Sequence, residues 1–175
     1  MFDSRTKARS LAFLFAASAL VCALTVVFGD ADTIPHKKVL VVAAVSLALA
    51  LVFSRYAARI HDRLLHAALI AMTIILSLVI HYTEHATLYP LIYMWPALYA
   101  FYFFSTPVAL VHLACIGVAY ATVLNLDDTI DATRLVLVLV LGTALVIGLM
   151  IARLQELMRS GIERSARRER ALRLS

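Results

Sequence analysis

Long apolar blocks alternate with short polar segments along the whole chain. Each block has roughly 15–20 residues, close to the ~20 that a helix needs to cross ~30 Å of hydrocarbon. We expect helices at about Ser10–Phe28, Val39–Phe53, Leu64–Tyr82, Tyr89–Phe104, Val108–Leu124 and Arg134–Ile151. The pattern therefore predicts an all-α integral membrane protein, built as a six-transmembrane-helix bundle.

The composition favours one membrane domain over a soluble one. Of the 175 residues, 63% are hydrophobic and 15% are charged, whereas soluble domains carry about a quarter charged residues. Both cysteines, Cys22 and Cys115, lie inside apolar blocks, which favours packing as small hydrophobic residues over a disulfide framework. The first block is long for a signal-peptide core, so we interpret it as a retained helix.

Basic residues gather on one side of the expected bundle. The tail Met1–Arg9, the 55–63 loop and the segment after Ile151 hold 13 Lys and Arg residues, and the three opposite loops hold 3. Because cytoplasmic loops carry the Lys/Arg excess, we expect both termini to be cytoplasmic. This placement explains the net charge of +5. We therefore expect the lipid bilayer as a partner and no nucleic acid.

The sixth expected helix has no stop signal and runs on beyond the membrane. A 4-3-4 spacing typical of a coiled-coil seam links Ile147, Ile151, Leu154 and Met158. We therefore divide the chain into a transmembrane domain, 1–153, and a cytoplasmic coiled-coil or basic linker helix, 154–175. Two interpretations stay open. The linker is either a basic helix drawn to anionic lipid, or a signalling helix that pairs two protomers as a homodimer and leads to an output domain.

The stretch 81–107 differs from the lipid-facing blocks around it. It holds the only tryptophan, five of the seven tyrosines and three of the four prolines. Rings with polar tips suit a helix that faces protein or a small-molecule cavity, and Pro96 predicts a kink that frees the carbonyl of Ile92. Plain packing is the alternative to a pocket for a lipid-like, quinone-like or aromatic ligand. The candidate pocket residues are Tyr89, Tyr93, Trp95, Tyr99, Tyr102 and His112.

The run LYPLIYMWPALYAFYFFSTPVALVHLACIGVAYATVL, at Leu88–Leu124, covers about a fifth of the chain. It resembles the aromatic-rich fourth and fifth helices of bacterial multi-pass membrane modules that precede GGDEF diguanylate cyclase domains. The resemblance implies a sensory or anchoring module of the bacterial inner membrane. Such a module transmits a ligand or membrane signal through its sixth helix to a cytoplasmic output domain. The chain itself contains no GGDEF motif, so we assign it no nucleotide chemistry and expect it not to be an enzyme.

Two histidines inside apolar blocks are candidate ligands. His66 and His112 lie on helices that both run outward, so we expect them at a similar depth. Two such imidazoles can supply both axial ligands of a haem b, which would make the chain a redox or quinol-responsive membrane protein. The alternative is an interfacial His66 and a His112 that hydrogen-bonds a neighbouring hydroxyl. A small transporter is a third hypothesis, which we rank low because only one helix carries a mid-helix proline.

His81 and His85 lie four residues apart, on one face if the third helix continues that far. With Glu84, and with His36 from another outer loop, they would bind Zn²⁺ or Cu²⁺. Zinc sites need three or four ligands in fixed geometry, and solvated histidines that titrate near ~6.5 are the alternative. The acidic loop 127–131 lacks the glycine and the spacing of an EF-hand, so we expect it to be solvated.

Overall fold

The computed structural model describes residues 3–28, 35–83, 90–126 and 137–158, which form helices and short turns with no strand among them. The labelled elements are α1 (Ser4–Phe28), α2 (His36–Arg55), η1 (Ala57–Arg59), α3 (Asp62–Thr83), η2 (Pro90–Tyr93), α4 (Met94–Phe103) and α5 (Thr106–Leu126). A further helix covers Leu137–Met158, and we call it the last described helix. The predicted all-α fold class is confirmed.

Five helices in the described part of the chain are long and apolar enough to cross a membrane. They are α1, α2, α3, α5 and the last described helix, whereas the apolar helix Leu91–Phe103 is shorter. At ~1.5 Å per residue this short segment spans roughly 20 Å, against ~30 Å of hydrocarbon. The chain is a multi-pass membrane protein by helix length and composition, and its fourth helix is shorter than the expected Tyr89–Phe104.

Helix α1 begins at Ser4 rather than at the expected Ser10. The carbonyl of Asp3 accepts the backbone N–H groups of Thr6 and Lys7 at 3.0 and 3.2 Å, which starts the helix inside the polar tail. Hydropathy places this first turn outside the helix because its side chains are polar. Lys7 is nevertheless buried, so the turn belongs to the packed bundle.

Pro96 in α4 and Pro107 in α5 both lie in the first turn of their helix. Pro107 lies at the start of α5, as the sequence predicts. Pro96 does not lie in mid-helix, where it was expected, because η2 comes first and α4 begins only at Met94. A proline in the first turn removes no helical hydrogen bond, since the first N–H groups of a helix have no partner within it.

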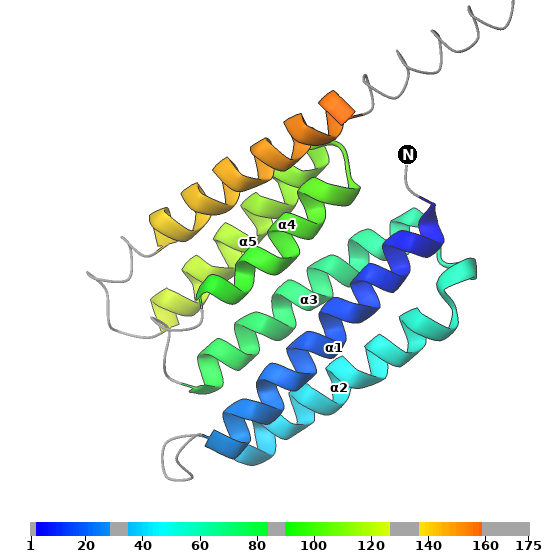
Figure 1. Cartoon of the computed structure of the whole chain (residues 1–175). Coiled ribbons are helices and arrows are strands. Elements are labelled where there is room, and N and C mark those ends of the chain that lie inside the picture. Colours follow the sequence, from blue (N-terminus) through cyan, green and yellow to red (C-terminus); the bar gives the residue numbers. More distant parts are fainter. Residues whose placement is uncertain (1–2, 29–34, 84–89, 127–136, 159–175) are drawn as a thin grey trace, which may run out of the picture.

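The helices pack as one bundle in which α3 has a central place (Figure 1). The most extensive helix contact joins α1 and α2, and α3 packs against both of them and against α5. Helix α4 packs on α5, and the last described helix lies along these two. Half of the apolar window of α3 is buried in the bundle, but only 17% of that of the last described helix. The last described helix is therefore the span that its neighbours cover least.

A small residue brings the last described helix close to α4. Gly148 faces the ring of Phe101, and a Cβ at this glycine would lie 2.5 and 2.6 Å from two of the ring carbons. A few residues further on, the side-chain amide of Gln155 donates to the carbonyl of Tyr102 at 2.9 Å. Close approach at small residues is a common way for membrane helices to associate. These contacts attach the last described helix to the end of α4.

One end of the bundle carries most of the described positive charge. This end holds the start of α1, the α2–α3 turn, the α4–α5 turn and the end of the last described helix (Figure 1). Seven of the nine Lys and Arg residues in the described ranges lie here, and we call it the basic end. The seven are Arg5, Lys7, Arg9, Arg55, Arg59, Arg63 and Arg153, while Lys37 and Lys38 lie at the opposite end.

Candidate functional site

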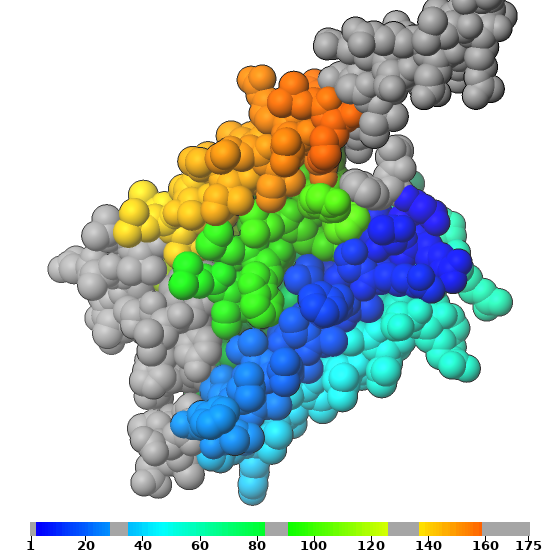
Figure 2. All heavy atoms as spheres, in the orientation of Figure 1, coloured from blue at the N-terminus to red at the C-terminus, as the bar shows by residue number. Residues whose placement is uncertain are grey.

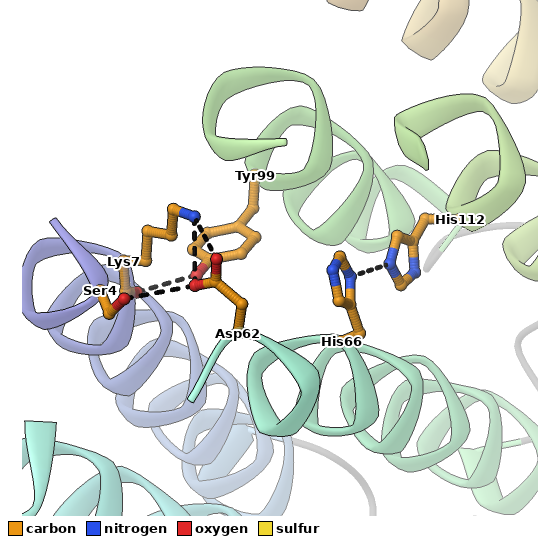
Figure 3. A network of polar contacts seen from close by, with 6 residues as sticks. All are labelled: Ser4, Lys7, Asp62, His66, Tyr99 and His112. Carbon is orange, nitrogen blue, oxygen red and sulfur yellow. Dashed lines mark hydrogen bonds and ion pairs between the residues drawn. The ribbon is translucent and has the colours of Figure 1, made fainter. Parts of the chain in front are cut away.

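Helices α1 and α3 meet at the basic end through an ion pair (Figure 3). Lys7 is 3% exposed, and its Nζ lies 3.2 Å from Oδ1 of Asp62, whose side chain is 46% exposed. The second oxygen of Asp62 lies 3.3 Å from the same ammonium, and the hydroxyl of Ser4 donates to Oδ1 at 3.3 Å. A charge held away from water is costly unless it is paired. The carboxylate therefore makes the burial of Lys7 possible and fixes the start of α1 against the start of α3.

Helix α4 and its C-cap residue join this ion pair through two aromatic rings. Tyr99 donates its hydroxyl to the backbone carbonyl of Lys7 at 2.8 Å (Figure 3). The ammonium of Lys7 lies 5.5 Å from the centre of the Phe104 ring, within the ~6 Å range of a cation–π contact. The same Phe104 ring lies 4.1 Å, centre to centre, from the ring of His66. Phe104 thus lies between the ion pair and a histidine of α3.

His66 and His112 contact each other directly and join α3 to α5 (Figure 3). Nδ1 of His66 lies 3.0 Å from Nε2 of His112, and the rings are 5.3 Å apart with only 14° between their planes. One nitrogen must donate and the other accept, so at least one imidazole is neutral in this arrangement. The two histidines lie at the same depth, as expected, but the partner of His112 is His66 and not a hydroxyl. We call Ser4, Lys7, Asp62, Tyr99, Phe104, His66 and His112 the polar network.

The contact between the two histidines does not fit a haem. Axial ligands hold the iron and the porphyrin plane between two imidazole nitrogens. Here the facing nitrogens of His66 and His112 are hydrogen-bonded at 3.0 Å, and the nearly parallel rings leave no space for a porphyrin. Haem ligation stays a prediction that requires the two side chains to separate.

Tyr93, one of the candidate pocket residues, is buried among α3 and α5. It is 1% exposed, its hydroxyl lies 2.6 Å from Oγ of Ser77, and its ring centre lies 5.4 Å from that of Tyr120. A buried tyrosine hydroxyl usually needs such a hydrogen-bond partner. Tyr93 therefore attaches η2 to α3 and α5.

An open groove lies between α1, α4 and the last described helix, which lie side by side on the face shown in Figure 2. Its volume is about 540 Å³, and its walls are mostly apolar or aromatic. Three candidate pocket residues line it, and Tyr93 and His112 do not. We call it the aromatic groove and define it by Arg9, Ser10, Phe13, Leu14, Trp95, Leu98, Tyr99, Tyr102, Phe103 and Ile151.

The remaining candidate residues lie at the opposite end of the bundle or outside the described residues. Tyr89, His85 and the acidic loop 127–131 are outside the described ranges. His81 is exposed near the end of α3, with its ring 5.7 Å from that of Tyr82. Within the described ranges, no group of three or more His, Cys, Asp and Glu side chains is placed to hold a metal ion. A metal at His81 and His85 stays a prediction.

Sequence reasoning missed the ion pair between Lys7 and Asp62. Lys7 lies in a polar tail and Asp62 in a charged loop, so hydropathy predicts solvent around both. The available signal is topological. Two helices that begin on the same side of the membrane, one near a lysine and the other near an aspartate, bring opposite charges to the same level.

The polar network holds helices together and lacks the arrangement of a hydrolytic site. Within it, no hydroxyl contacts an imidazole, so the nucleophile–base pair of such a site is missing. Its groups instead satisfy one another across α1, α3, α4 and α5, as a structural network of buried polar groups does.

Comparisons with family models, with curated proteins and with solved structures find no match for this chain.

Proposed function

We propose that this chain is a membrane sensory module that passes a change in helix packing through the last described helix to a cytoplasmic partner or output domain. One observation carries the proposal. The segment 101–104, at the end of α4, contacts the polar network through Phe104 and the last described helix through Phe101 and Tyr102. A single short segment therefore links the polar network to the last described helix.

The link is short, because neighbouring residues form it. The ring of Phe104 lies near both the Lys7 ammonium and the His66 ring, so a change in the pairing of either group moves it. Polar groups within a membrane are costly when unpaired, which gives such a change a large energetic effect. The backbone joins Phe104 to Tyr102, whose carbonyl accepts from Gln155. A shift at Phe104 is thereby passed to the last described helix.

The charge distribution supports a direction for the proposed signal. Cytoplasmic segments of membrane proteins are rich in Lys and Arg, which supports a cytoplasmic basic end and, together with the resemblance to GGDEF-associated modules, a bacterial inner membrane. Leu154 and Met158, in the predicted seam, are 56% and 53% exposed. This exposure supports the pairing of two protomers along the seam as a homodimer.

Disulfide crosslinking in membranes tests the proposal. In a chain with Cys22 and Cys115 replaced by alanine, Leu154→Cys should crosslink between protomers, and the neighbouring Arg153→Cys should crosslink much less. Adding Phe104→Leu, which keeps the site apolar but removes the ring between Lys7 and His66, should change the crosslinking efficiency at position 154 at least twofold. Efficiency that is equal at both positions, or indifferent to Phe104→Leu, would contradict the proposal.

A further inference from the structure

We infer that the aromatic groove is a binding site for one anionic phospholipid of the surrounding bilayer. The inference names a ligand for the proposed sensory module. It is measured by lipid binding alone, so its failure and the failure of signalling through the last described helix can be told apart.

The groove has the dimensions of a ligand site. Its volume of about 540 Å³ falls within the ~300–1,000 Å³ of typical small-molecule pockets. On α4 its walls run from Tyr102, at the basic end, to Trp95, which lies two helical turns deeper. At ~1.5 Å per residue, the seven steps from Trp95 to Tyr102 cover roughly 10 Å of depth, enough for the upper part of an acyl chain.

The groove is polar at one end and apolar along its depth. Arg9 and Ser10 are its polar members on α1, nearest the basic end. Phe13 and Leu14 follow one turn deeper on the same helix, opposite the aromatic wall of α4. An arginine at the basic end of an apolar groove complements a molecule with an anionic head and an acyl tail.

The surroundings of the groove decide between the bilayer and the solution as the source of this molecule. The groove is open at its side, on a helix surface that is apolar enough to face hydrocarbon, with Phe13 74% exposed. A lipid of the bilayer reaches such an opening without leaving the membrane.

A lipid in this groove would touch each of the elements that the proposed signal involves. Tyr99, which lines the groove, donates its hydroxyl to the carbonyl of Lys7 in the polar network. Ile151 contributes the wall on the last described helix. Occupation of the groove would therefore favour one position of that helix relative to α1, because the lipid fills the space between them.

Trp95 makes the site directly measurable. It is the only tryptophan of the chain, and it lines the groove, so the intrinsic tryptophan fluorescence reports only the lipid beside it. The purified full chain is reconstituted in phosphatidylcholine vesicles that contain increasing fractions of dibrominated phosphatidylglycerol or dibrominated phosphatidylcholine. Bromine quenches the fluorescence of an indole ring that it touches. The two quenching curves, one for each brominated lipid, give the binding constant of the anionic lipid at Trp95 relative to that of phosphatidylcholine.

Phosphatidylglycerol should be preferred about fivefold over phosphatidylcholine, as expected from one basic residue near the headgroup. Arg9→Gln should bring the preference close to one, and Arg9→Lys should keep it. Arg59→Gln is the matched control, because it removes a charge from the same end of the bundle away from the groove. Equal quenching by the two lipids, or an equal loss of preference in Arg59→Gln, would overturn the inference.

Discussion

Replacing Gly148 by alanine should weaken the attachment of the last described helix to α4. The new Cβ would lie 2.5 and 2.6 Å from Cγ and Cε2 of Phe101, and closer still to Cδ2. Carbon atoms pack best at ~3.5–4.0 Å, so the helix or the ring has to move by roughly 1 Å or more. Overpacking of this kind typically costs ~1–3 kcal/mol.

Gly142→Ala is the matched control on the same helix. A Cβ at Gly142 meets no atom within 4 Å, so this variant keeps only the gain in helix propensity, ~1 kcal/mol in water. Both variants share that gain, and the difference between them isolates the contact with Phe101. We therefore expect Gly148→Ala to be less stable than Gly142→Ala by ~1–3 kcal/mol.

The free energy of unfolding can be compared in detergent micelles by titration with dodecyl sulfate, followed by circular dichroism. Phe101→Leu in the Gly148→Ala background should recover part of the loss, because a smaller side chain makes room for the methyl group. Equal stability of Gly148→Ala and Gly142→Ala would refute the close packing of the last described helix on α4. It would also remove one of the two contacts on which the proposed signal depends.

Three further outcomes follow from the polar network. Asp62→Asn should reduce the free energy of unfolding by ~1–3 kcal/mol, because it leaves a buried ammonium unpaired. Lys7→Met should cost less. The opposite order in detergent unfolding would contradict the burial of Lys7. His66→Phe and His112→Phe should each be destabilising, and the double variant should cost less than the sum, with a coupling of ~0.5–3 kcal/mol; additive losses would mean that the rings do not interact. The purified protein from haem-sufficient cells should show no Soret band that shifts on reduction with dithionite, because the rings of His66 and His112 leave no space for a porphyrin. Such a band, lost in His112→Ala, would show that the two rings separate to bind haem.

The helix positions are predictable from the sequence because hydropathy acts along the chain. Apolar blocks identify each span, and Pro107 marks the start of α5. Hydropathy fails where a polar residue is buried by a distant partner, as Lys7 is by Asp62. It also fails for the short α4, where the aromatic run continues through η2 and hides the change of helix type.

The candidate site is predictable in its residue types but not in its grouping. The sequence singles out His66 and His112, and the structure brings them into contact. The tyrosines form an apparent cluster only along the chain, because Tyr93 faces the interior and Tyr102 faces the aromatic groove. Which side of a helix faces which neighbour depends on tertiary packing, and a short helix with apolar residues all round gives no periodicity from which to predict it.

The distance between spin labels on Ala58 and Glu156 tests most directly whether the polar network controls the last described helix. Both residues are exposed at the basic end, one on η1 and the other on the last described helix. In a chain without its native cysteines, Phe104→Leu should shift or broaden the distance distribution of this pair. The pair Leu40 and Ala58, which joins α2 to the adjoining η1, should keep its distribution. Superimposable distributions for Ala58 and Glu156, with and without the Phe104 ring, would contradict transmission through the end of α4.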